Sequence, residues 1–362
     1  MADYFDTGFA VRERSWHGKE KLLADWPADW DEARRFAGIE WEPEERRLAV
    51  QVQTCLGCGE RLHADHSVSC PTLYSNGIPS TTVATMVLEH DCADRWEPVT
   101  THKAIVRSDT GFHLGTVGAD WTPITHAVMG EIVEALLDQP NVKIDTMLSM
   151  KEGRQVAATI LLDEPYTITG DDSLTLPYLV LLNAHDGSSA MKAVATQVRV
   201  VCANTYAAAS MQGDRLGTQF VFRHTSKVLD RIEEAKAAIS GAKQDAVDWQ
   251  ELAAELAVLP APSGTVTRFL SEFIPEPPAG VVSDRVRENI ADARRQWSLN
   301  YEGSVTNAAH HGTALGMVDA SVEYLDHLRA YRSKDTLLGR QLLRPEPLKA
   351  KAVKIAKAVC NA

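Results

Sequence analysis

The segment from residue 104 to residue 224 constrains the fold most strongly, because apolar runs of strand length alternate in it with turn residues. Two runs flank the Ser-Asp-Thr-Gly sequence at residues 108–111, which is typical of a β-hairpin. Residues 124–138 repeat apolar side chains at helical spacing and end before Pro140. Further strands are expected at residues 48–54, 146–150, 155–162, 178–183 and 219–224. This pattern predicts an α+β fold with a central antiparallel sheet and helices packed on one face.

Helical patterns dominate the rest of the chain. Helices are expected at residues 30–37 and 197–211, and further ones at 227–259, 283–298, 313–332 and 348–359. Pro260 and Pro262 end the first long stretch. We therefore expect an acidic N-terminal segment (1–100) with a zinc-ribbon-like insertion (about 50–95), a central α+β core (101–258) and a helical C-terminal region (259–362).

The charge balance limits the possible partners. Lysine and arginine total 37 against 49 aspartates and glutamates, a formal charge of −12, so any site for a polyanion has to be local. No run approaches the roughly 18 apolar residues of a membrane span. The N-terminus is acidic and lacks the apolar region of a signal peptide. These features predict a cytoplasmic protein without a membrane partner.

The sequence Cys55-Leu-Gly-Cys58-Gly has the spacing of a zinc knuckle. His90 and Cys92 close a candidate four-ligand set, because a second strand expected at residues 81–89 would return the chain to the knuckle. Four protein ligands fill a tetrahedral site, which predicts a structural zinc ion. Competing ligands are Cys70, His63 and His66, and the alternative is that the cysteines are free thiols.

Basic residues gather at two places. The central group contains Lys192, Arg199, Arg215, Arg223, His224, Lys227 and Arg231, with Tyr206 and Phe222 as aromatic side chains that could stack on bases. The C-terminal group lies on an expected helix and contains Arg340, Arg344, Lys349, Lys351, Lys354 and Lys357. For this second group, nucleic-acid binding and a solvated helix face are equally compatible with the pattern.

A polar turn at residues 183–189 holds Asn183, His185, Asp186, Ser188 and Ser189. A histidine beside serines invites a hydrolase interpretation, but neighbours in one turn rarely point at each other, so a hairpin turn is the favoured reading. Glu323 and His327 lie one helical turn apart, which suits a salt-bridged helix better than a second metal site. No P-loop or dinucleotide-binding fingerprint is present, which argues against an ATPase or a dinucleotide enzyme.

Several phrases together resemble a known family. They are VRERSWHG, IVRSDTGFHLGTVGADWTPITH, LVLLNAHDGSSAMKAVATQVRVVCANTYAAA, RHTSKVLDRIEEAKAAI and GTALGMVDASVEYLDH. They are similar to the phage/plasmid-like proteins of domain-of-unknown-function family 932, and the NAHDGSSAMKAVATQVRVVCANT piece is the most specific. The resemblance implies a phage, prophage or plasmid setting and no established activity. The CLGCG to EHDC segment resembles an insertion in that pattern.

The order of elements is also similar to the core of phage single-strand annealing proteins of the RecT/Redβ class, a likeness of element order only. The leading functional expectation is a non-enzymatic protein that binds single-stranded nucleic acid, with strand annealing as its role and a homo-oligomer as its form. Alternatives are a structural or host-interaction protein, such as an inhibitor of a bacterial defence system, and a hydrolase that uses His185, Asp186 and Ser188.

Overall fold

The computed structural model describes most of the chain. The described residues are 6–11, 21–55, 92–199, 204–207, 219–227, 232–278, 280–329 and 347–361. Within them, no helix combines the length and apolarity that crossing a membrane requires.

The strands are β1 (Thr7–Val11), β2 (Lys21–Leu23), β3 (Pro43–Cys55), β4 (Cys92–Arg107), β5 (His113–Gly118), β6 (Lys143–Met150), β7 (Gln155–Leu161), β8 (Tyr166–Ile168), β9 (Asp171–Ala184), β10 (Met191–Arg199), β11 (Asn204–Ala207) and β12 (Gln219–Phe222). The helices are α1 (Trp30–Ala37), α5 (His126–Leu137), α6 (Ile232–Val258), α7 (Ser263–Phe273), α8 (Asp284–Gly303), η3 (Val305–His310), α9 (Ala314–Glu323), η4 (Tyr324–Leu328) and α11 (Pro347–Cys360).

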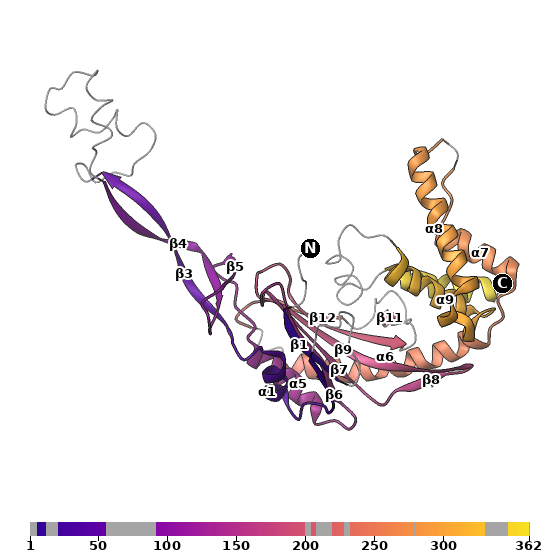
Figure 1. Cartoon of the computed structure of the whole chain (residues 1–362), viewed down its shortest axis with the longest axis horizontal. Helices are drawn as coiled ribbons and strands as arrows, with labels where there is room; N and C mark the ends of the chain where they lie inside the picture. The colour runs from indigo at the N-terminus through magenta and orange to yellow at the C-terminus, as the bar shows by residue number, and fades with distance from the viewer. Residues whose placement is uncertain are drawn as a thin grey trace, which may run out of the picture.

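A mostly antiparallel sheet forms the centre of the molecule (Figure 1). Its order is β11-β10-β9-β7-β6-β1-β2, with β12 also paired to β10 and β8 also paired to β9. Only the β1–β2 pair is parallel among the described pairs. The α+β prediction with a central antiparallel sheet is confirmed. Strands β1, β2, β8 and β10 had no counterpart in the sequence prediction.

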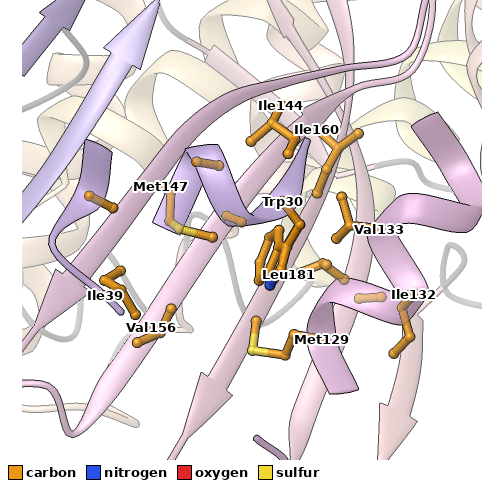
Figure 2. Packing of buried hydrophobic residues seen from close by; sticks show 14 of the residues in the cluster. Trp30, Ile39, Met129, Ile132, Val133, Ile144, Met147, Val156, Ile160 and Leu181 are labelled. Carbon is orange, nitrogen blue, oxygen red and sulfur yellow. The ribbon is translucent and has the colours of Figure 1, made fainter. Parts of the chain in front are cut away.

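Helices α1, α5 and α6 run along one face of this sheet (Figure 1). The face is apolar because alternate strand residues, such as Leu179 and Leu181, point to the same side. Trp30 of α1 and Met129 of α5 pack against them (Figure 2). Gly130 makes this packing possible, because a Cβ atom there would lie 2.4 Å from Cδ1 of Trp30. The predicted helix ending before Pro140 is therefore confirmed as α5, with its apolar stripe on the sheet.

Strands β3, β4 and β5 form a second, smaller sheet that leaves the body of the molecule as a ribbon (Figure 1). The hairpin predicted around residues 108–111 is confirmed as the β4–β5 turn. Strand β5 pairs with β4 only from His102 to Val106, so beyond that point the ribbon consists of β3 and β4 alone. The predicted strand at residues 48–54 is the outer part of β3, whereas the one expected at 81–89 lies outside the described residues.

The C-terminal region is helical, as predicted, and has its own core. Helix α6 carries Trp249, Leu252, Ala253 and Leu256 at helical spacing, and all four side chains are buried in that core. Helix α11 closes it with a further apolar stripe that includes Val353 and Ala356. Helix α7, between the Pro262 turn and residue 274, had not been predicted from the sequence.

The helix predicted at residues 197–211 is wrong where the chain is described. Residues up to Arg199 complete β10, and Asn204–Ala207 form β11, which pairs back onto β10. Thr196, Val198 and Thr205 are β-branched, and this favours strands once a neighbouring strand is available for pairing. Residues 208–211 lie outside the described part of the chain.

Candidate functional site

Three of the predicted nucleic-acid-binding residues gather at one end of the sheet edge formed by β12 and β11. Lys192 on β10 is the register partner of Val221 on β12, and Arg223 follows two residues later on the same side of the strand. The side chains of Arg223 and Lys227 are exposed, and that of Lys192 is half-buried. The sheet therefore brings cations from two segments together, as basic groups for a phosphate chain require.

Arg199 and Tyr206 belong to the other end of the same edge. Arg199 is the register partner of Asn204, and Tyr206 is that of Gln197. Seven residues separate Arg199 from Lys192, which is about 23 Å along an extended strand. An odd separation also assigns the two positions to opposite faces of β10. The five predicted residues thus form two groups along one sheet edge.

An aromatic stack supports the first group. The rings of Trp121 and His224 are parallel within 13° and their centroids are 4.1 Å apart. Nδ1 of His224 donates to the carbonyl oxygen of Thr122, and the amide of Thr122 donates to the carbonyl oxygen of His224. Burial lowers the pKa of His224 to about 4, so the ring is neutral at pH 7. This stack fixes the backbone next to Arg223. His224, which the sequence assigned to the basic group, is a buried and neutral ring in the fold.

The expectation that Phe222 stacks on bases is wrong for the folded chain. Its side chain is 2% exposed and belongs to the core beneath the sheet. Phe222 alternates with Val221 and Arg223 along the strand, so it points to the opposite, apolar face.

The C-terminal lysines have intramolecular partners instead of a common free face. Nζ of Lys349 lies 2.7 Å from the carboxylate of Asp326, and both side chains are buried. Lys351 donates to the backbone carbonyls of Glu272 and Phe273 at the end of α7, and Lys357 pairs with Glu255. These contacts favour the structural interpretation of this group. Arg340 and Arg344 lie outside the described residues.

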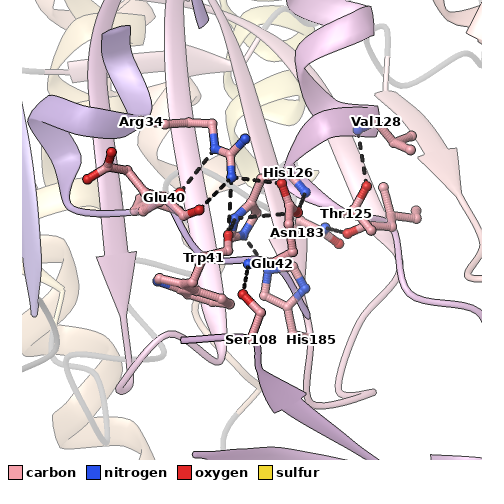
Figure 3. Close-up of polar contacts among 12 residues, drawn as sticks. Arg34, Glu40, Trp41, Glu42, Ser108, Thr125, His126, Val128, Asn183 and His185 are labelled. Carbon is pink, nitrogen blue, oxygen red and sulfur yellow. Dashed lines mark hydrogen bonds and ion pairs between the residues drawn. The ribbon is translucent and has the colours of Figure 1, made fainter. Parts of the chain in front are cut away.

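A buried histidine pair joins the ribbon to the sheet (Figure 3). Nδ1 of His126 lies 2.7 Å from the carbonyl oxygen of Trp41, which can only accept, so Nδ1 carries the hydrogen. Nε2 of His126 must then accept from Nε2 of His185, 3.0 Å away. Burial lowers the pKa of His126 to about 3 and that of His185 well below its ordinary value. Both rings are therefore neutral, with one defined tautomer each.

The residues around this pair hold the start of β3. The backbone amide of His126 donates to the Glu42 carboxylate at 2.6 Å, and Arg34 pairs with the same carboxylate at 2.7 Å. Ser108 accepts from the amide of Glu42 through its hydroxyl. The Trp41 ring packs edge-on against both imidazoles. This joint, defined as Trp41, Glu42, His126 and His185, anchors the ribbon on α5 and β9.

The polar turn after β9 does not form a catalytic triad. The amide of Ser188 donates to Asp186, Gly187 has a φ of +77°, and the Ser188 hydroxyl accepts from Gln155. The Ser189 hydroxyl donates to the carbonyl oxygen of Ala190. His185 is fully buried and its Nε2 contacts His126. The turn chemistry that the sequence indicated is confirmed.

Two of the predicted zinc ligands lie opposite each other on the paired strands β3 and β4. Cys55 ends β3 and Cys92 begins β4, and they are register partners at the outer end of the ribbon. Cys58 and His90, with the competing ligands Cys70, His63 and His66, lie outside the described residues. Among the residues that are described, no group of three or more potential ligands is close enough to hold a metal ion.

Glu323, which the sequence paired with His327 as a conceivable second metal site, has other contacts, and so do the neighbouring His310 and Asp319. The carboxylate of Glu323 accepts from the hydroxyls of Thr306 and Ser304. Nδ1 of His310 lies 2.8 Å from Asp319, and both side chains are buried. These contacts hold η3 on α9, and they favour a structural role.

A family model described as a domain of unknown function (DUF932) matches residues 113–344, more than half of the chain. The chain belongs to the DUF932 family. No curated protein and no solved structure matches it. The DUF932 region contains His126, His185 and His224, whereas Trp41 and Glu42 precede it and α11 follows it. The core beneath the central sheet and the core of the C-terminal helices therefore each include residues from segments outside the family region.

Proposed function

We propose that this DUF932 protein binds single-stranded nucleic acid along the edge of its sheet and promotes strand annealing for a phage or plasmid. The observation that supports the proposal is the register pairing of Lys192 with Val221, which places Lys192 diagonally across the β10–β12 ladder from the exposed Arg223. A backbone held by cations at a sheet edge leaves its bases free to pair, as annealing requires. Such a protein would act in the host cytoplasm, where its template is found.

The charge distribution makes the proposed site local. The chain carries −12, so long-range attraction of a polyanion is absent and binding depends on the few cations at the edge. Each neutralised phosphate releases counterions, so binding by Lys192, Arg223 and Lys227 should weaken steeply with salt. Arg199 and Tyr206, about 23 Å further along the strand and on the other face of β10 by strand alternation, are not part of this group of cations.

The proposal is tested by fluorescence anisotropy with a labelled single-stranded oligonucleotide at low and moderate salt, with a duplex of equal length beside it. We expect single-strand binding that Arg223→Ala and Lys227→Ala weaken and that salt weakens further. Lys354→Ala, which removes an exposed cation of α11, is the matched control and should bind as the unaltered protein does. Absence of binding at low salt would exclude the proposal and favour a protein partner.

We also propose a structural zinc ion at the outer end of the ribbon, held by Cys55, Cys58, His90 and Cys92. The proposal is supported by the register pairing of Cys55 with Cys92, since ligands from two strand ends can then reach one ion. Metal analysis of the purified protein should give one zinc per chain, reduced in Cys55→Ser and Cys92→Ser. Retention of zinc in both variants would assign the ion to other ligands, with Cys70, His63 and His66 tested next.

A further inference from the structure

Among the described residues, the outer edge of the ribbon is a strand edge without a pairing partner. In the part of the chain that the structure describes, β3 pairs with β4 along its whole length and with no strand on its other side. Figure 1 shows the two strands leaving the body of the molecule together. An open edge of this length presents a row of amide and carbonyl groups that another strand can pair with.

The two halves of β3 differ in whether their residues favour or oppose pairing with a further strand. The inner half, Pro43 to Arg47, contains a proline and four charged residues and ends at a bulge, which are devices that discourage strand addition. The outer half reads Leu-Ala-Val-Gln-Val-Gln-Thr from residue 48 to residue 54, without charge, proline or glycine. Val50 in this half is 49% exposed. Only the outer half is therefore suited to pairing.

We propose that the outer half of β3 pairs edge to edge with β3 of a second copy of this chain, antiparallel and centred on Gln51. In this register Val50 lies opposite Val52 of the second copy, and Leu48 lies opposite Thr54. The even positions of both β3 strands then share one face, so the two central strands of the joined sheet present Leu48, Val50 and Val52 there, flanked on each side by Arg95 and Glu97 of β4. The two Gln51 residues meet at the two-fold axis and are neutral, so no like charges oppose each other.

The chemistry of the ribbon selects a second copy over a nucleic acid. Opposite the outer half of β3, β4 carries Asp94, Arg95 and Glu97, so this stretch has no excess of cations for a phosphate chain. Two-stranded ribbons are marginal in water, and joining two of them makes a four-stranded sheet. A self-complementary edge also satisfies the requirement that a two-fold interface uses the same surface on both copies.

Cysteine cross-linking tests the register directly. Gln51→Cys places the new thiol opposite itself across the two-fold axis, within the Cα separation that a disulfide needs. Gln53→Cys is the matched control, because it would face Ala49 of the second copy. We expect a covalent dimer on a non-reducing gel after mild oxidation for Gln51→Cys only, above the background of the unaltered chain. Equal cross-linking of both variants would overturn the proposal.

Sedimentation of the zinc-replete full chain gives an independent test. The unaltered protein should be a dimer, and Val50→Lys should shift it to a monomer because the charge disrupts the shared apolar face. Val305→Lys is the control, since Val305 is 88% exposed and lies on η3. A monomeric unaltered protein at high concentration would refute the proposal. Near-ultraviolet circular dichroism shows whether Val50→Lys is folded, and the cross-linking result stands if it is not.

Discussion

Each of the two cores is closed by a segment from outside the family region, and each closure includes a buried polar contact of a different kind. In the sheet region, the contact consists of two neutral rings, His126 and His185, with the carbonyl oxygen of Trp41. In the helical region it is an ion pair between Lys349 and Asp326. A neutral contact avoids the cost of burying charge but is sensitive to acid. A charged contact fails when one partner is removed.

The largest effect is expected in the helical region. Asp326→Ala leaves the ammonium group of Lys349 buried without its carboxylate, which should lower the free energy of unfolding by about 3–5 kcal/mol. Urea unfolding measures this change. The double variant Asp326→Leu with Lys349→Met removes both charges and should recover most of the loss. A double variant as unstable as the single one would show that the pair itself, and not the orphaned charge, stabilises this core.

Lowering the pH should reduce the stability of the sheet region. The pKa of His126 is about 3 in the fold and its ordinary value is 6.5, so the native state binds fewer protons than the unfolded state. Stability is then complete above pH 6.5 and falls below it, by about 1.4 kcal/mol per pH unit for each such histidine. Urea unfolding from pH 7 to pH 5 measures the slope. His113→Gln, at an exposed histidine, should leave the slope unchanged, whereas an unchanged midpoint over this range would contradict the neutral joint.

The packing of α5 on α1 gives a smaller effect. In Gly130→Ala the new methyl group would lie 2.4 Å from Cδ1 of Trp30, so the ring has to move. Overpacking of this kind costs about 1–3 kcal/mol, which outweighs the gain in helix propensity. Thermal unfolding measures the loss. Gly264→Ala in α7 has open space around the new methyl group and serves as the control. Equal stability of the two variants would mean that Trp30 is free to adjust.

The smallest effect concerns the cap of α7. Lys351→Met removes the donor to the carbonyls of Glu272 and Phe273, and we expect a loss of about 0.3–1 kcal/mol because the site is near the surface. Lys354→Met, on the exposed side of the same helix, should change the unfolding midpoint less. The order of the two variants in urea, repeated at high salt, checks the prediction.

Local patterns predicted the elements that depend on nearby residues. The stripe of α5 and the β4–β5 hairpin were both visible in the sequence, since their periodicity and turn residues are local. The failure at residues 197–211 has a non-local cause. Asn204–Ala207 form a strand because they pair with β10, and the sequence near these residues does not indicate that pairing.

The sequence predicted which types of side chain form the candidate sites, but it did not predict which of them lie close together. The cations Lys192 and Arg223 were identified from the sequence, but the register that places them diagonally across the β10–β12 ladder was not. His185 was noted as one residue of a polar turn, and its contact with His126 joins positions 59 residues apart. The C-terminal lysines formed an apparent basic group until Asp326, Glu255 and the end of α7 were found beside them.

The sequence by itself determined the α+β class, the helical C-terminal region and the types of side chain available for binding. These follow from periodicity, turn chemistry and composition, which depend on neighbours within a few residues. The tertiary structure alone decided which cations are exposed, which histidines are neutral and where the ribbon begins. Charge and protonation depend on burial and on partners distant in the chain, and only the packed fold brings those partners together.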